Sequence, residues 1–319
     1  MNLRSVARAL GGEVSSGQVL APGPGHSHKD RSLSVRISPG APDGFLAFSH
    51  AGDDWRACRD YVRGRLGIET ERRERPTNKR PAPEPRSDDS KTRDAARRLF
   101  AESINARGTL AEHYLTVERG LPGVIDDTLA LTLRFHPAGP FRDGETLVRA
   151  PALVAALRDP QAAMHACSHL EDMEDIERRF LSDPANVLAI QRIRLDAEGR
   201  KVERRSLGPL GNGVVFASSI FEQFYSASST ICEGVESALA ARKLGFPGVV
   251  AITGVSRLRS FSPPFIWGSI TGIAENDEAS ESAWRDAAPR WRGAGHRVRV
   301  VAPPSGDAND YLRGAQHGR

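Results

Sequence analysis

The sequence predicts an α/β protein whose C-terminal part, residues 228–314, folds around a central, mostly parallel sheet. Two observations lead to this fold class. Short runs of β character alternate with helix-forming stretches, which is the pattern of βαβ units. Several expected strands also end directly at acidic residues, at the edge where open α/β sheets bind their ligands. The expected elements are strands at 229–232, 249–253, 270–274 and 297–301 and helices at 236–244 and 279–291.

The first expected strand ends at Glu233, which is followed by Gly234 and a helix-forming stretch. Glycine adopts backbone angles that a side chain forbids, so the chain can turn sharply beside this acid. Taken alone, Glu233 is better interpreted as a solvated turn residue. The acids that follow later strands favour a site instead.

Two later strands end at acids as well. Glu275 and Asp277 follow the strand at 270–274, and their i, i+2 spacing lets both carboxylates point the same way and share a cation. Mg²⁺ prefers a few carboxylates together with phosphate oxygens and water. A third acidic group follows the strand at 297–301. We therefore expect an acidic edge that binds Mg²⁺ or Mn²⁺ through Glu233, Glu275, Asp277, Asp307 and Asp310.

These acids resemble the signature of the Toprim domain of bacterial and phage primases, topoisomerases and some nucleases. Glu233-Gly234 matches its strand-end Glu-Gly, and Glu275-x-Asp277 matches its later Asp-x-Asp. Gly-Asp-Ala-Asn-Asp-Tyr-Leu at 306–312 resembles the ending of the primase-like proteins of phages and integrated elements. The resemblance implies a Rossmann-type Toprim domain at 228–314. Glu275 in place of aspartate and Ser280 in place of the usual glycine depart from the pattern.

Composition predicts two or three polar domains. The chain has 319 residues, of which 39% are hydrophobic and 26% charged. The net charge is only +4, but 44 Lys and Arg and 40 Asp and Glu occur in separate clusters, which favours local basic surfaces and a polyanionic partner. No apolar run approaches the roughly 20 residues of a membrane span, and the start lacks the apolar core of a signal peptide. Three widely separated cysteines form no metal or disulfide pattern, so we expect a cytoplasmic protein without a membrane partner.

Residues 1–68 are expected to form a small unit with a helix at 3–10, strands at 33–37 and 45–48 and a helix at 54–66. The unit resembles the zinc ribbon at the start of bacterial primases, through Pro-Gly-His at 24–26, Arg-Ser-Leu-Ser-Val at 31–35 and Ala-Gly-Asp-Asp at 51–54. Its cysteines are missing, because Gly23 and Ser49 stand where two are expected. We therefore expect a degenerate ribbon that holds no structural zinc and is stabilised by packing. A three-histidine site is the alternative, with His26, His28 and His50 as ligands.

Basic residues of this unit (His26, Lys29, Arg31 and Arg36) fit a solvated face and a phosphate-contacting surface about equally. A proline-rich, charged segment at 69–92 is expected to be a flexible linker. Residues 93–227 are expected to form an α+β middle domain. Its expected elements are helices at 95–105 and from 109, strands at 131–135 and 152–157, and an acid-rich surface insertion with a helix between 160 and 184.

A basic hairpin precedes the acidic domain, with strands at 188–195 and 202–207 around the turn Asp-Ala-Glu-Gly. Such a face is often an inert cationic surface. Its density directly before the acidic site favours contacts with nucleotide or nucleic-acid phosphates. The residues expected to make them are Arg192, Arg194, Lys201, Arg204 and Arg205.

The resemblance implies template-directed nucleotidyl transfer. Glu233 would then be the acid/base or metal-organising group, with Glu275 and Asp277 as metal ligands. It also implies primer synthesis from nucleoside triphosphates on single-stranded DNA in replication of a phage or mobile element, with a replicative helicase as a further candidate partner. Two alternatives stay open. A Toprim nuclease uses the same acids for cleavage, and a non-catalytic DNA-binding or replisome-docking protein fits the missing zinc ligands, Glu275 and Ser280.

Overall fold

The structure, a computed structural model, describes residues 2–15, 17–37, 43–51, 53, 55–68, 87–167, 173–222, 228–264, 267–304 and 306–317. The chain divides into two compact units. The first consists mainly of residues 1–83, and the second of residues 84–294 and 298–319. No helix in the described part of the chain is long and apolar enough to cross a membrane.

The first unit is a four-stranded antiparallel sheet in chain order, with two helices packed against it. Leu10 and Val62 of the helices share a buried core with Leu33 and Phe45 of the sheet. The predicted helices and the strands of the second hairpin are confirmed. The first hairpin was not predicted, because its strands are too short to show a period. The elements are α1 (Leu3–Leu10), β1 (Glu13–Ser15), β2 (Gln18–Ala21), β3 (Leu33–Ile37), β4 (Phe45–Ser49) and α2 (Trp55–Leu66).

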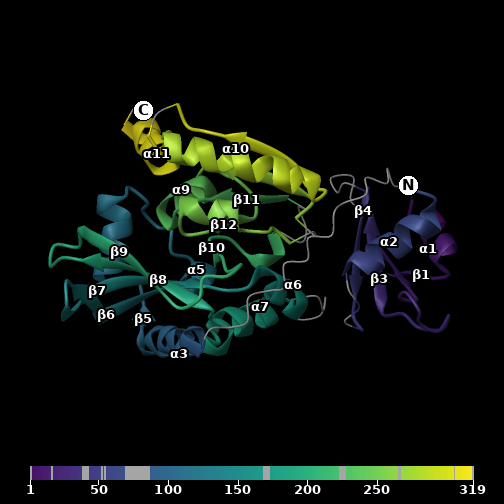
Figure 1. The fold of residues 1–319 in the computed structure, drawn as a ribbon, viewed down its shortest axis with the longest axis horizontal. Helices are drawn as coiled ribbons and strands as arrows, with labels where there is room; N and C mark the ends of the chain where they lie inside the picture. Colours follow the sequence, from purple (N-terminus) through teal and green to yellow (C-terminus); the bar gives the residue numbers. More distant parts are fainter. Residues whose placement is uncertain are drawn as a thin grey trace. The chain divides into compact units, whose positions relative to one another are not determined.

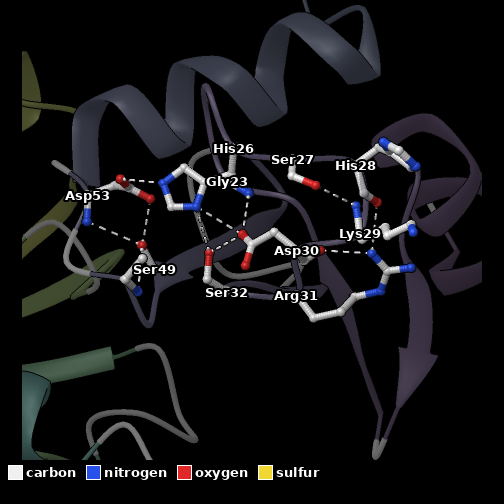
Figure 2. A network of polar contacts seen from close by, with 11 residues as sticks. Gly23, His26, Ser27, His28, Lys29, Asp30, Arg31, Ser32, Ser49 and Asp53 are labelled. Carbon is white, nitrogen blue, oxygen red and sulfur yellow. Dashed lines mark hydrogen bonds and ion pairs between the residues drawn. The ribbon is translucent and has the colours of Figure 1, made fainter.

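His26 ties the loop between β2 and β3 to the segment that follows β4 (Figure 2). Its Nδ1 lies 3.0 Å from Asp30, and its Nε2 lies 3.0 Å from Asp53. Both ring nitrogens are engaged, so the alternative site with His28 and His50 does not form. Among the described residues, no group of three His, Cys, Asp or Glu side chains is placed to hold a metal ion.

The second unit begins with α3 (Ser87–Glu102), which starts earlier than the predicted helix at 95–105. Residues 87–92, predicted to be linker, form its first turns, and the remaining linker residues, 69–86, lie outside the described part of the chain. The helix ends before 105, because residues 104 and 105 pair with the next strand as β5 (Ile104–Asn105).

The middle domain is built on a five-stranded antiparallel sheet in the order β5-β6-β7-β8-β9, as seen in Figure 1. Helix α3 covers one face, where Phe100 packs on Val154 and Ile190. The other face packs against a second core that includes Tyr114 and Ile193. The longer elements are β6 (Leu133–Asp143), β7 (Thr146–Leu157), β8 (Ala189–Leu195) and β9 (Lys201–Leu207), with α4 (Leu110–His113), η1 (Tyr114–Glu118) and α5 (Asp127–Thr132) before them.

Two predictions for this domain were wrong. The strand predicted at 131–135 begins only at Leu133, because the preceding residues complete α5. The acid-rich segment is also not a surface insertion: it forms α6 (Pro160–Ala166) and α7 (Met173–Ser182), and Leu181 is fully buried. Glu177 of α7 is buried too, where it accepts hydrogen bonds from Ser219 Oγ at 2.7 Å and the Ile220 amide at 2.8 Å.

The C-terminal domain is a five-stranded sheet in the order β10-β12-β11-β13-β14. β11 lies parallel to β12 and β13, as predicted, and the unpredicted β10 pairs antiparallel with β12. Helices α9 and α11 pack on one face, while α10 packs on the other. The elements are β10 (Val215–Phe216), β11 (Ser228–Cys232), α9 (Val235–Lys243), β12 (Val249–Ala251), η3 (Val255–Arg259), β13 (Ser269–Ile273), α10 (Glu278–Gly293), β14 (Arg297–Val301) and α11 (Ala308–His317).

A candidate acidic site beside a basic strand

The register of the parallel strands brings the predicted acids to one end of the sheet. Cys232 of β11 pairs with Ile273 of β13, so Glu233 and Glu275 leave neighbouring strands one and two residues later. On the other side, Cys232 pairs with Ala251 of β12. The Gly254 amide donates to the Glu233 carbonyl at 2.8 Å, which brings the turn after β12 to the same edge.

Glu233 is the buried centre of this edge, with 4% of its surface exposed. Its Oε1 accepts a short hydrogen bond from Ser280 Oγ and one of 3.1 Å from Trp284 Nε1. Burial raises the pKa of Glu233 to about 7, and the charges of Glu275 and Asp277 add to the rise, although the two hydrogen bonds oppose it. Glu233 can therefore exchange a proton near neutral pH.

Glu275 and Asp277 are linked to Glu233 through Ser280. The Glu275 amide donates to Ser280 Oγ at 2.9 Å, and the Ser280 amide donates to Asp277 Oδ1 at 2.8 Å. Asp277 thus caps the N-terminus of α10, a position that favours aspartate. The pKa of Glu275 is raised by burial and by the charges of Asp307 and Asp277.

The two acids of the third group, Asp307 and Asp310, have different positions relative to the acidic edge. Asp307 lies 3.7 Å from Arg119 Nη2, and its charge acts on Glu275, so it belongs to the edge. Asp310 is exposed and forms a reciprocal turn with Asp307: the Asp310 amide donates to Asp307 Oδ1 at 2.8 Å. The structure gives Asp310 no contact with Glu233, Glu275 or Asp277 within the described residues.

The pleat of β8 and β9 divides the five predicted basic residues between two faces. Arg204 pairs with Ile193 and Lys201 with Leu195, on the face that packs toward the acidic domain. Arg204 lowers the pKa of Glu275, and its Nη1 would lie 3.8 Å from a Cβ atom at Gly234.

Arg192, Arg194 and Arg205 lie on the opposite face. Arg192 is buried, donates to the Pro140 carbonyl and lies over the Phe141 ring at 5.1 Å. Arg194 and Arg205 both pair with Glu203, at 3.3 and 2.6 Å. The structure therefore brings Arg204 to the acidic edge and Lys201 to Glu236, and it directs the other three arginines away from the edge.

Sequence reasoning missed a buried polar group behind the edge. Glu236 in the first turn of α9 accepts from Lys201 Nζ at 2.7 Å and from the Tyr114 hydroxyl at 2.9 Å. Burial would raise the pKa of Glu236, but the charge and hydrogen bond of Lys201, a backbone amide hydrogen bond and the Arg119 charge together lower it to about 2. The pKa of Tyr114 is raised by burial and by the Glu236 charge. Glu236 is three residues after Glu233, which was the available signal.

Tyr114 lies in a π-helix, η1, and Arg119 is the residue that follows it. Short π-helical segments are often found at functional sites. The Arg119 carbonyl accepts from Asn309 Nδ2 at 2.5 Å, which fixes α11 against η1. Nothing local in the sequence predicts this arrangement, because the partners are 190 positions apart.

Thr253 marks a strained point on the same edge. Its φ of 61° is unusual for a β-branched residue, and Gly254 follows with φ 148°. Arg257 stabilises this turn by donating to the Ile252 carbonyl and, at 3.3 Å, to Thr253 Oγ1. Strained backbone that is held by its surroundings concentrates at functional sites.

The donor set fits a hard divalent cation. Burial and the neighbouring carboxylate charges raise the pKa of both Glu233 and Glu275, and neither Glu233 nor Asp277 has a paired cation among the described residues. Binding a cation would lower the repulsion between these carboxylates. The described residues supply no cage of three ligands, yet Mg²⁺ is commonly held by one or two carboxylates together with phosphates and water. One or two of Glu233, Glu275 and Asp277 would therefore hold it, with phosphate oxygens and water as the other ligands.

Two family models match parts of the chain. Residues 228–318 match the family model "Toprim domain", and residues 90–170 match a domain of unknown function, DUF7146. The C-terminal part of the chain is therefore a Toprim domain, as its motifs predicted. No curated protein matches the sequence.

Several solved structures are similar to the chain, including the following three. The zinc-binding and RNA polymerase domains of the Aquifex aeolicus primase have 14% identity and a TM-score of 0.45, covering 98% of this chain and 79% of that one. The primase fragment of the bacteriophage T7 primase-helicase has 16% identity and a TM-score of 0.39, covering 94% and 97%. The RNA polymerase domain of Mycobacterium tuberculosis primase has 13% identity and a TM-score of 0.42, covering 73% and 82%.

Proposed function

We propose that the chain is a primase-like Toprim protein that joins nucleotides on a single-stranded DNA template. The observation that carries this proposal is one edge where Glu233, Glu275 and Asp277 lie beside Arg204 of the neighbouring basic strand, whose Lys201 pairs with Glu236 behind that edge. Acids of this kind suit a divalent cation, and an exposed arginine beside them suits a triphosphate.

Each residue then has a defined task. A bound Mg²⁺ or Mn²⁺ would neutralise charge at the α-phosphate and orient the attacking 3′-oxygen. Glu233, with a pKa of about 7, holds or accepts a proton at Oε2, because Oε1 is occupied by Ser280 and Trp284. Arg204 is exposed and contacts the triphosphate. Lys201 donates one N–H to Glu236, and its remaining N–H groups can donate to phosphate oxygens.

The setting is part of the same proposal. We place the protein in the cytoplasm, in replication of a phage or mobile element, with a replicative helicase as a candidate partner. Arg194 and Arg205 are proposed to follow the template backbone away from the nucleotide, since they lie on the other face of the hairpin, where the buried Arg192 supports the sheet instead of contacting the template.

Two alternatives have specific support. A Toprim nuclease would use the same acids. A non-catalytic binding protein is favoured by Glu275 and by the two hydrogen bonds that occupy Glu233 Oε1. Incubation with labelled single-stranded template, NTPs and Mn²⁺ separates the three: new oligomers indicate synthesis, shortened template indicates cleavage, and a shifted but intact template indicates binding only. Glu233→Gln is the inactive variant, and Asp310→Asn, which changes an exposed acid off the edge, is its matched control.

A further inference from the structure

Two donors from α10 converge on the same oxygen of Glu233. Ser280 and Trp284 are four residues apart and therefore lie on one side of the helix. Both are buried, at 0% and 3% exposure, and both donate to Oε1. Oε2 accepts no hydrogen bond from the described residues, so the two oxygens of this carboxylate are unequal.

The direction of the Ser280 hydrogen bond is fixed. Its Oγ accepts from the Glu275 amide at 2.9 Å, which leaves the single hydroxyl proton for Glu233. The cap formed by Asp277 holds the backbone of Ser280 in turn. The residue that departs from the usual Toprim glycine thus connects all three acids.

The position of Trp284 depends on Gly272 of β13. A Cβ atom at Gly272 would lie 2.4 Å from the indole ring, so any side chain there would displace the ring. Trp284 also packs edge-on against Trp291, with ring centroids 5.5 Å apart. The indole N–H is consequently held in place by packing against β13 and against Trp291 of the same helix.

We propose that Ser280 and Trp284 are positioning residues that hold Glu233 by Oε1 and reserve Oε2 for the cation or the reacting proton. This inference rests on the proposed function for its chemical meaning, but it concerns the geometry of Glu233 alone. It assigns Ser280 a role in the site, where the family pattern has a residue without a side chain.

The test uses the full chain and measures Mn²⁺ affinity by calorimetry alongside nucleotide incorporation. Ser280→Ala should weaken Mn²⁺ binding by about tenfold or more, the factor for losing a hydrogen bond to a charged group. Ser280→Thr, which keeps the hydroxyl, should restore most of the affinity. Trp284→Phe, which keeps a ring but loses the N–H, should show a severalfold loss, with kcat reduced more than KM is raised.

Unchanged Mn²⁺ affinity in Ser280→Ala and Trp284→Phe would overturn the inference, as would a wild type that binds no Mn²⁺. A Ser280-dependent Mn²⁺ affinity without any synthesis supports the inference while the proposed function fails. If Ser280→Thr is as weak as Ser280→Ala, the hydroxyl is not the positioning group and the inference fails.

A separate observation in the first unit carries a second inference. His26 lies between two carboxylates, Asp30 and Asp53, at 3.0 Å from each (Figure 2). An ionised carboxylate only accepts hydrogen bonds, and a neutral imidazole has one N–H and one lone pair. Ser32 donates its proton to Asp30, so it does not supply the missing donor. The geometry therefore selects the imidazolium form, with both ring nitrogens donating.

The surrounding residues complete this ion-pair network. Asp53 Oδ2 accepts from Ser49 Oγ at 2.8 Å, and Asp30 Oδ2 accepts from the Gly23 amide at 3.4 Å. A Cβ atom at Gly23 would lie 2.8 Å from Asp53 Oδ2, so a side chain there would displace the Asp53 carboxylate from its present position. Gly23 and Ser49 are the two positions at which the resemblance would place zinc cysteines. The network thus joins the same two chain segments that a ribbon's metal would join.

The charged groups that face the ring are Asp30 and Asp53, which raise the pKa of His26 against the opposing effect of burial. Nearby Arg31 is directed away, toward Glu13 at 3.3 Å and the carbonyls of His28 and Asp30. We infer that the His26 imidazolium is a metal-free cross-link that makes the first unit weaken as pH rises through neutrality. A raised histidine pKa stabilises below the unfolded value, about 6.5, and the stabilisation is lost as pH passes the folded value.

Hydrogen exchange of the full chain tests this inference through the amides of β3 and β4. Their protection, corrected for the pH dependence of intrinsic exchange, should fall severalfold between pH 6 and pH 9. Asp53→Asn keeps the shape and should move the fall to lower pH. His28→Gln, which changes an exposed histidine two positions away, is the control and should behave as wild type.

Constant β3 and β4 protection across this range in the wild type would overturn the cross-link. So would an unchanged pH profile in Asp53→Asn, or protection that depends on zinc and is lost on chelation.

Discussion

Lys201 donates to Glu236 at 2.7 Å, and this partly buried ion pair joins the basic strand of the middle domain to the first turn of the Toprim helix α9. Glu236 is 3% exposed and also accepts from Tyr114, so three elements meet at one carboxylate. Glu236 follows Glu233 by three residues, so its ion pair with Lys201 holds the basic strand next to the acidic edge.

Removing Lys201 should destabilise the second unit. Lys201→Met leaves the buried Glu236 charge without its cation. Because Lys201 is about one-third exposed (33%), we expect a loss of roughly 1–2 kcal/mol, below the 3–5 kcal/mol typical of fully buried pairs. Arg205→Met is the matched control on the same strand: its 62% exposed side chain pairs at the surface, so about 0.5 kcal/mol or less is expected. Urea unfolding measures both, and equal losses would contradict a special role for Lys201.

Metal-free stability should fall as pH rises from about 4.5 to about 7. The folded pKa of Glu233, about 7, lies above the ordinary 4.5, so the folded state binds this proton more tightly than the unfolded state. The stabilisation is full below the ordinary pKa and is lost as pH rises through the folded value. Glu233→Gln, which cannot titrate, should flatten this part of the curve. A slope that persists unchanged in Glu233→Gln would assign the effect to other groups.

Millimolar Mg²⁺ or Mn²⁺ should raise the melting temperature of the wild type, because binding to the folded state offsets carboxylate repulsion. Asp277→Asn should lose most of this rise, yet it should start from an equal or higher melting temperature without metal. Asparagine caps helices about as well as aspartate, so α10 keeps its N-cap. Glu275→Asp restores the usual Toprim pair and should bind metal more tightly if the longer side chain weakens the site. If neither the wild type nor Glu275→Asp responds to metal, a non-catalytic role would be favoured.

Nucleotide and template contacts should separate on the two faces of the hairpin. Arg204→Ala should raise the KM for nucleoside triphosphates, since Arg204 faces the acidic edge. Arg205→Ala should leave that KM unchanged and reduce the salt dependence of DNA binding by about one counterion. Nucleotide titrations and binding measured at several salt concentrations test the pair. Identical effects of the two substitutions would contradict the division.

The sequence could predict the acidic edge because each part of it is local. Strand, acid, glycine and helix follow one another at Glu233, and strand ends in a parallel sheet meet at one edge. The face of the sheet on which Lys201 lies could not be predicted from strand alternation, because alternation would put Lys201 on the same face as Glu203 and Arg205. A bulge between Arg194 and Leu195 shifts the register and turns Lys201 to the side of Arg204.

Long-range contacts explain the other omissions. Tyr114 and Glu236 are 122 positions apart, and no spacing rule connects them. A buried polar contact also explains why the acid-rich segment packs as helices. Glu177 does not face solvent but accepts hydrogen bonds from Ser219 Oγ and the Ile220 amide. Such placements follow from tertiary packing and not from local periodicity.

The central claim is tested most directly by primer synthesis on single-stranded DNA with NTPs and Mn²⁺, comparing the wild type with Glu233→Gln and Asp310→Asn. We predict labelled oligomers from the wild type and Asp310→Asn and none from Glu233→Gln, with the template intact. A shortened template, or oligomers from Glu233→Gln at the wild-type yield, would contradict the account.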